Sequence, residues 1–298
     1  KKNSKKSIWV FGDYRNYYQN RVTLQLIARA VALAKVIDAE VCALIFGYEI
    51  DEWIMEYTAH GADRILAIDD PELQSYSTEK YLAIIEALAK ERDPEIILIG
   101  ATDFGREFAP RLAKRLKTGL SADCVGLDIT DDGLLLQIAP SFGGNMLAEI
   151  VTERHRPQMA TVRPGTFKEI PHDHQRKAVV ERLPLMKNLP KPRVRLIEYE
   201  RSVEKEHTIE NASVIVCGGR GMGNKEKFKK LQELARLLGG DVGATRPVVY
   251  AGWAEHGALV GQAGKHIKPK LLFSFGISGA IQHTAGLGEA DFIIAVNK

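Results

Sequence analysis

Apolar segments of strand length alternate with amphipathic segments of helix length through the first 118 residues or so. Runs of apolar residues predict strands at residues 8–11, 41–46, 64–68 and 95–100. Between these runs, apolar residues recur at helical spacing, which predicts helices at residues 22–37, 51–60, 77–90 and 106–116. This strand–helix order is typical of a mainly parallel sheet that helices cover on both faces. The predicted fold class is therefore α/β.

The pattern changes after Gly119. Shorter apolar segments predict strands at residues 121–128, 134–139, 146–151 and 158–163. Asp131-Asp132-Gly133 is a hairpin-type turn between the first two of them. We expect this stretch to complete or extend the first sheet, and Pro164-Gly165 to end it.

Residues 166–205 are rich in charge and proline, and we interpret them as a connecting segment. Extended pieces are expected in this region at residues 178–183 and 194–199. We divide the chain into an N-terminal domain, 1–205, which includes the connection, and a C-terminal domain, 206–298. Within the connection, His172-Asp173-His174 is interpreted as a solvated loop, because the sequence offers no third metal ligand nearby.

The C-terminal domain repeats a strand, a glycine-rich turn and a helix. Strands are predicted at residues 214–217, 271–275 and 292–296, and a helix at 225–238. The turn Gly218-Gly219-Arg220-Gly221-Met222-Gly223 follows the first strand. It is not a dinucleotide-binding fingerprint, because the required spacing would place glycine where Asn224 stands. Its glycines still allow a close approach of the backbone to a ligand.

The segment from Lys270 to Asn297 is the strongest candidate for a binding site. Gly276 and Gly279 bracket a turn after an apolar strand, and we expect a helix to begin at about Ser278. Such a turn presents free backbone N–H groups to a phosphate. Gln282 and His283, one turn further, would point back at the same ligand. The alternative is an ordinary strand–helix–strand unit with a close-packed glycine turn.

Composition narrows the classes of function. The chain has 298 residues, 45% hydrophobic and 27% charged, which is typical of a globular protein of two domains. A net charge of +3 gives no case for nucleic-acid binding. No apolar run approaches the ~20 residues that a membrane helix needs, so we expect no membrane insertion. Three separated cysteines indicate reduced thiols and a cytoplasmic location.

Several motifs of the C-terminal domain occur together in one order: CGGRGMG, GATRPVV, VGQAGK, GISGAIQHTAGL and IIAVNK. With TGLSAD and SFGGNMLAEI in the first half, the chain closely resembles the alpha subunit of electron transfer flavoproteins. That family includes nitrogen-fixation-linked and flavin-bifurcating forms. The resemblance covers nearly the whole chain.

The resemblance implies an N-terminal domain similar to adenine nucleotide hydrolases and a C-terminal domain that binds FAD. The first domain lacks a glycine-rich ATP loop, so we expect it to bind a partner and no nucleotide. The resemblance implies a heterodimer with a beta subunit. It would pass electrons between NADH or flavoprotein dehydrogenases, such as acyl-CoA or lactate dehydrogenase, and an acceptor. Electron bifurcation with ferredoxin is a sub-hypothesis, and a nucleotide-binding scaffold subunit without redox function is the alternative. Whether the chain counts as an enzyme is left open.

The resemblance also implies cofactor-binding residues, but no catalytic residue and no metal ligand. Val260 to Ala263 would pass the edge of the isoalloxazine ring, and Ser278 to His283 would hold the pyrophosphate and the pyrimidine end of the ring. Arg246 or His283 would stabilise negative charge on the reduced flavin and raise its potential. The full set of expected contacts is Arg220, Thr245, Arg246, Val260, Gly261, Gln262, Ala263, Ser278, Gly279, Ala280, Ile281, Gln282, His283 and, on the adenosine side, Asn297.

Two departures from the family pattern bear on this site. Many members carry Thr or Ser at the position of Ala263, with a hydroxyl that faces the flavin N5 atom, whereas Ala263 has no side-chain donor. Members also continue past the last strand with a segment that contains an Asp and contacts the cofactor. This sequence stops at Lys298, so we expect either a tail that lies beyond it or an incomplete FAD-binding domain.

Overall fold

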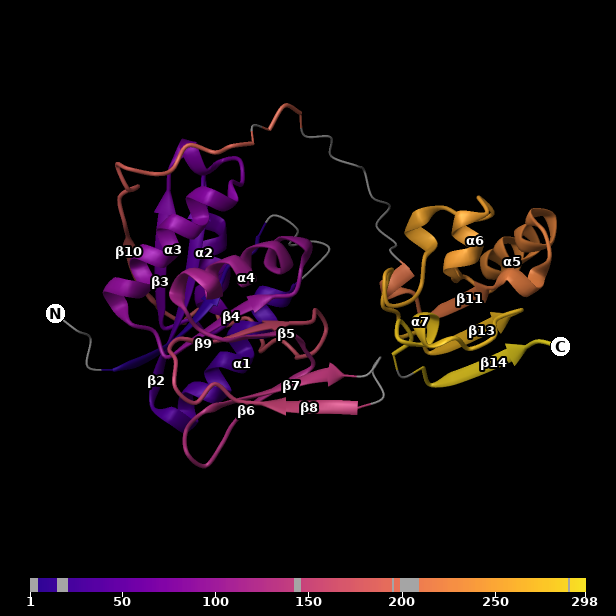
Figure 1. The fold of residues 1–298 in the computed structure, drawn as a ribbon, viewed down its shortest axis with the longest axis horizontal. Helices are drawn as coiled ribbons and strands as arrows, with labels where there is room; N and C mark the ends of the chain where they lie inside the picture. Colours follow the sequence, from indigo (N-terminus) through magenta and orange to yellow (C-terminus); the bar gives the residue numbers. More distant parts are fainter. Residues whose placement is uncertain (1–4, 15–20, 142–145, 195, 199–208, 289) are drawn as a thin grey trace. The chain divides into compact units, whose positions relative to one another are not determined.

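The computed structural model describes residues 5–14, 21–141, 146–194, 196–198, 209–288 and 290–298. The chain forms two compact units, Lys1–Glu198 and Tyr199–Lys298 (Figure 1). The predicted boundary between residues 205 and 206 lies outside the described residues and stays a prediction. Each unit is built on a parallel sheet, which confirms the α/β fold class. Among the described residues, no helix has the length and apolar character that crossing a membrane requires.

A seven-stranded parallel sheet forms the centre of the first unit. Its strand order is β10-β3-β2-β1-β4-β9-β5. The chain leaves β1 and β4 toward opposite edges, as in doubly wound sheets. The strands are β1 (Lys6–Phe11), β2 (Ala39–Gly47), β3 (Arg64–Asp69), β4 (Ile96–Gly100), β5 (Leu120–Cys124), β9 (Gln158–Val162) and β10 (Val179–Arg182).

Helices cover both faces of this sheet (Figure 1). One apolar core joins the sheet to α1 (Val22–Ile37) and α2 (Asp51–Ala59), and the other joins it to α3 (Thr78–Arg92) and α4 (Asp103–Leu116). A short 3₁₀ turn spans Pro71–Leu73. Helix α4 begins three residues earlier than predicted because the hydroxyl of Thr102 accepts a hydrogen bond from the Gly105 N–H and caps it.

The prediction of one strand over residues 121–128 is wrong. Asp123, with a φ of +57°, makes an irregularity within β5, where the register with β9 shifts, and Val125 breaks the strand between β5 and β6 (Gly126–Ile129). Strand β6 pairs with β7 (Leu135–Ser141), and β7 with β8 (Met146–Ile150), in a separate three-stranded antiparallel sheet. The expectation that this stretch extends the first sheet is therefore confirmed for β5 and β9 and wrong for β6, β7 and β8.

The first part of the connecting segment belongs to the first unit. The expected extended piece at 178–183 is present as β10, which pairs with β3 at the edge of the sheet. The second expected piece, 194–199, forms no strand in residues 194 and 196–198. Residues 195 and 199 lie outside the described residues.

The second unit is a four-stranded parallel sheet in the order β12-β11-β13-β14. From β11 the chain passes first to β12 on one side, and later to β13 on the other. The strands and helices are β11 (Val214–Gly218), β12 (Asp241–Ala244), β13 (Leu271–Phe275), β14 (Phe292–Val296), α5 (Lys225–Leu237), α6 (Arg246–Tyr250) and α7 (Ile281–Thr284), with 3₁₀ turns at Ile209–Asn211, Arg220–Met222 and His256–Ala258. Phe228 of α5 is fully buried against one face of the sheet.

Candidate functional site

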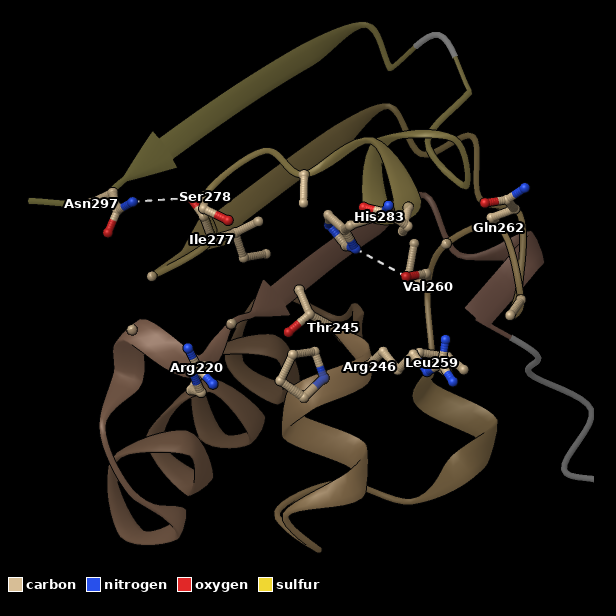
Figure 2. Close-up of a pocket in the computed structure, with 18 residues that line it drawn as sticks. Arg220, Thr245, Arg246, Leu259, Val260, Gln262, Ile277, Ser278, His283 and Asn297 are labelled. Carbon is tan, nitrogen blue, oxygen red and sulfur yellow. Dashed lines mark hydrogen bonds between the residues drawn. The ribbon is translucent and has the colours of Figure 1, made fainter. Parts of the chain in front are cut away.

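A cavity of about 690 Å³ lies in the second unit, a size usual for small-molecule sites. Figure 2 shows Arg220, Thr245 and Arg246 on one side of it and Ser278, His283 and Asn297 on the other. The residues that line it are Gly219, Arg220, Gly221, Thr245, Arg246, Pro247, Leu259, Val260, Gly261, Gln262, Ala263, Gly276, Ile277, Ser278, Ala280, Gln282, His283 and Asn297.

The sheet topology explains why residues so far apart in sequence meet here. Gly219 follows the end of β11, Thr245 follows β12, Gly276 follows β13 and Asn297 follows β14. Because all four strands are parallel, their carboxyl ends share one edge of the sheet. The chain leaves β11 and β13 in opposite directions, and ligands of open α/β sheets bind in the crevice at such a point.

Glycine backbones close the base of this crevice. Gly276 has a φ of +60°, and a Cβ there would lie 2.7 Å from the backbone of Gly221. A Cβ on Gly219 would lie 2.3 Å from the carbonyl oxygen of Gly276. The approach allows the Gly221 N–H to donate to the Gly276 carbonyl at 3.0 Å. Side chains at these positions would force the two turns apart, so the shape of the cavity depends on the glycines.

A second backbone contact joins α7 to the loop at residues 259–265. The Gln262 N–H donates to the Gln282 carbonyl at 2.7 Å. Gly261, with a φ of +146°, makes this possible, because a Cβ there would lie 2.3 Å from the same carbonyl oxygen. The loop therefore holds Gln262 and Ala263 at the cavity beside His283.

His283 presents a buried ring nitrogen without a hydrogen-bond partner. Its Nδ1 lies 2.9 Å from the Val260 carbonyl oxygen (Figure 2). A carbonyl only accepts, so Nδ1 carries the proton and the neutral ring has its lone pair on Nε2. Nε2 is buried and unpartnered among the described residues. Burial lowers the pKa of His283, against a smaller raising effect of the bond to Val260. A donor from a bound ligand or a water molecule would satisfy this atom.

The charges at the cavity favour an anion. Arg220 and Arg246 line it, and the described lining residues include no Asp or Glu. The guanidinium of Arg246 also lies 5.0 Å from the centre of the Tyr250 ring, which restricts its position. Guanidinium groups bind phosphate and other planar or multiply charged anions well.

The cavity gathers all the predicted cofactor-binding residues except two. Gly279 and Ile281 belong to the same segment but do not line it. That these residues bind a cofactor stays a prediction. The sequence did not predict contacts for six further lining residues: Gly219, Gly221, Pro247, Leu259, Gly276 and Ile277. Four of them, Gly219, Gly221, Gly276 and Ile277, belong to the two glycine turns that the sequence analysis identified.

Two details of the predicted site differ from expectation. Helix α7 begins at Ile281 and is one turn long, so the prediction of a helix from about Ser278 is wrong. Gly279 has a φ of +72°, which keeps Ser278 to Ala280 out of helical geometry, and backbone donors there belong to a loop. Asn297 donates from its amide to the Ile277 carbonyl at 3.0 Å, so part of its hydrogen-bonding capacity holds the turn.

Comparison with known proteins adds independent information. Residues 8–188 match the family model of the electron transfer flavoprotein domain. Residues 208–288 match that of the electron transfer flavoprotein FAD-binding domain. The second match covers most of the cavity.

Three similar proteins illustrate the range of relatives. "Electron transfer flavoprotein subunit alpha" of Thermoanaerobacterium thermosaccharolyticum is 43% identical, over 99% of this chain and 90% of its own length. "Lactate dehydrogenase (NAD(+),ferredoxin) subunit LctC" of Acetobacterium woodii is 38% identical, over 98% and 70%. "Acryloyl-CoA reductase electron transfer subunit beta" of Anaerotignum propionicum is 34% identical, over 99% and 88%.

The lowered pKa of His283 predicts a pH dependence of stability. Below about pH 6.5 the unfolded chain takes up a proton that the folded ring resists. The unfolded state then binds more protons, so the free energy of unfolding of the second unit should fall as the pH falls. The slope cannot exceed about 1.4 kcal/mol per pH unit for one group.

This dependence can be measured as the accessibility of the buried Cys217 thiol during urea unfolding. The rate at which the Cys217 thiol is labelled is measured at about pH 5.5 and pH 7.5, and each rate is divided by that of the fully unfolded chain at the same pH. His283→Gln should flatten the dependence, whereas His256→Gln, an exposed histidine of the same unit, should retain it. The same slope in His283→Gln as in the unsubstituted chain would rule out His283 as its source.

Proposed function

The chain belongs to the electron transfer flavoprotein family as an alpha-type subunit, and we propose that it holds FAD in the cavity at the carboxyl edge of β11 to β14. The observation that carries this proposal is the convergence of motif residues from four strand ends on one cavity. Family membership establishes a flavin-binding chain of electron transport. FAD as the flavin, and the role of each residue, are proposed.

The residues at the cavity fit a dinucleotide with an anionic centre. Two guanidinium groups, without a carboxylate among the described lining residues, suit a pyrophosphate. The buried Nε2 of His283 has no hydrogen-bond partner among the described residues, and a flavin ring can supply one. The glycine turns allow backbone N–H groups to approach a ligand closely. We assign the phosphate contacts to Arg220 and the Ser278 loop.

A bound flavin supplies the electron-transfer chemistry, so the chain needs no residue that forms or breaks covalent bonds. Its residues position the ring, exclude water and fix the local charge. Arg246 stabilises negative charge that develops beside it. His283 is an acceptor at Nε2 when neutral, but a nearby negative charge raises its pKa and favours the protonated ring, which donates instead. Ala263 leaves only backbone groups for hydrogen bonding at its position.

The first unit carries features that support binding to a beta subunit. Strand β8 lies at the edge of its three-stranded sheet, with no further strand described beyond it. Met146 and Leu147 on β8 are 58% and 62% exposed, and Ile150 is also exposed. Exposed apolar side chains on an unpaired strand edge are typical of a protein-binding surface. We propose that this surface contacts the partner subunit, and that the first unit binds no nucleotide.

The names of relatives suggest an electron donor and acceptor for this chain. The printed names of two relatives include a lactate dehydrogenase that uses NAD⁺ and ferredoxin, and an acryloyl-CoA reductase. We propose that this chain exchanges electrons with NADH or a flavoprotein dehydrogenase of that kind. We further propose that the complex bifurcates electrons, with ferredoxin as one of the two acceptors. A cytoplasmic location remains a prediction.

Flavin stoichiometry tests the proposed function. The chain is co-expressed with its beta subunit, and the flavin of the purified dimer is released, identified and counted. Bound FAD is expected. One FAD per dimer would support a simple carrier, and two would support bifurcation. A stably folded dimer that takes up no added FAD would contradict the proposal and leave a scaffold subunit as the interpretation.

Replacing Arg246 should change the flavin rather than the fold. Arg246→Ala removes an exposed cation at the cavity and should lower the potential of the bound flavin, because negative charge on the reduced ring loses its counter-charge. A loss of ~1.4 kcal/mol corresponds to a decrease of ~30 mV for a two-electron couple. A spectroscopic redox titration measures the change. Arg236→Ala, an exposed arginine of α5, is the control, and an equal effect in both variants would remove the assigned role.

A further inference from the structure

A group of metal-ligating side chains lies in the first unit, far in sequence from the residues of the cavity. Glu56 and His60 lie one turn apart at the carboxyl end of α2, and His172 comes from the segment that follows β9. One ligand atom of each residue lies within 4.8 Å of the other two. The expectation that His172 has no further ligand near it is therefore wrong, because two come from α2.

The spacing of these atoms suits a four-coordinate ion. Nε2 of His172 lies 3.6 Å from one Glu56 carboxylate oxygen, and a ring nitrogen of His60 belongs to the same group of ligand atoms. Two ligands at about 2.1 Å from a tetrahedral zinc ion are about 3.4 Å apart. The Glu56 and His172 atoms therefore already have nearly the separation of two zinc ligands, and His60 would have to bring its Nε2 to the same point.

His60 is oriented as a metal-binding histidine usually is. Its Nδ1 lies 2.9 Å from the Glu56 carbonyl oxygen, and because a carbonyl only accepts, Nδ1 carries the proton. Nε2 then keeps its lone pair for a metal. A backbone carbonyl that fixes the second ring nitrogen is a common outer contact of metal-binding histidines. The side chain of His60 is 96% buried, so the imidazole is held in place.

Backbone contacts hold His172 beside α2 without any ion. The Asp173 N–H donates to the Ala59 carbonyl at 3.0 Å. Arg176 donates to the Gly61 carbonyl at 2.9 Å and to the Asp63 carboxylate at 2.7 Å. These contacts hold the segment 173–176 against residues 59–63, which lie at and just after the end of α2. A binding site assembled in this way requires little ordering when the ion binds.

Arg21 is a described cation in contact with this group. Nη2 of Arg21 lies 3.9 Å from the Glu56 carboxylate, but the Arg21 guanidinium makes hydrogen bonds of 2.7–2.9 Å to Glu169. A metal ion binds imidazole in its neutral form, so the group would offer the ion two uncharged ligands and one carboxylate. The ring of His174 lies 4.1 Å from that of His172, between centroids, and is available as a fourth ligand.

We propose that Glu56, His60 and His172 bind one Zn²⁺ ion, with His174 or water as the fourth ligand. Imidazole-rich sets of this kind favour transition metals over Mg²⁺ or Ca²⁺. The ion would join α2 to the segment that leads into β10 and the connection. Its role is structural: it ties the start of the connecting segment to the first unit.

Zinc binding to the intact dimer tests this proposal. The chain is co-purified with its beta subunit, treated with a chelator, and dialysed against micromolar Zn²⁺, and bound metal is counted by elemental analysis. His172→Ala replaces an exposed side chain and should weaken binding of one Zn²⁺ per chain by at least ~10-fold. Glu56→Gln, which keeps the size of the side chain but removes its charge, should also weaken it.

His155→Ala is the matched control, because His155 is an exposed histidine of the same unit outside the group. It should bind zinc as the unsubstituted chain does. Any zinc bound by the partner subunit is unchanged in all variants and is subtracted. No zinc attributable to this chain at micromolar concentration, or equal binding by His172→Ala and His155→Ala, would overturn the proposal.

Discussion

The close approach of two glycine turns at the carboxyl ends of β11 and β13 is the constraint on which the site depends. Gly219 and Gly221 lie against Gly276, and the positive φ of Gly276 turns the chain away from β13. Since β11 and β13 are parallel neighbours, the segments that follow them diverge above this contact. A side chain at Gly219, Gly221 or Gly276 would fill the base of the crevice with its own atoms. The cavity is thus a consequence of topology together with a few residues that lack a Cβ.

Electrostatics then gives the cavity its chemical character. Arg220 lies in the 3₁₀ turn after β11, and Arg246 is the first residue of α6, after β12. His283 lies across the cavity on α7. Fixed cations favour a ligand with a phosphate centre and stabilise charge that appears during reduction. His283 can respond to such charge, because its Nε2 is an acceptor while the ring is neutral and a donor once it is protonated. In the function we propose, the same group of residues both holds the cofactor and sets its potential.

The sequence predicted the elements well where the pattern was long and periodic. The helix predicted at 22–37 has the bounds of α1, and the strand at 271–275 has those of β13. The failures come from backbone conformations that apolar spacing does not encode. The run 121–128 reads as one strand but is irregular at Asp123 and breaks at Val125, and Gly279 delays the start of α7 until Ile281.

The candidate site was predictable to the extent that its residues stand in ordered motifs. Family resemblance identified the segments, but contacts between segments were not visible from the chain. The bond from His283 to Val260, and the unpaired Nε2 that results, depend on two loops meeting in space. The group of Glu56, His60 and His172 is the clearer case, because His172 was judged from its sequence neighbours while Glu56 and His60 lie far earlier in the chain.

The measurement that tests the central claim most directly is hydrogen exchange of the dimer with and without FAD, resolved to peptides. Binding at the carboxyl edge of the second sheet predicts slower exchange in the segments 219–222, 260–263 and 276–283, with little change in the first unit. Protection confined to the first unit, or none in these three segments while FAD is bound, would contradict the proposed location of the cofactor.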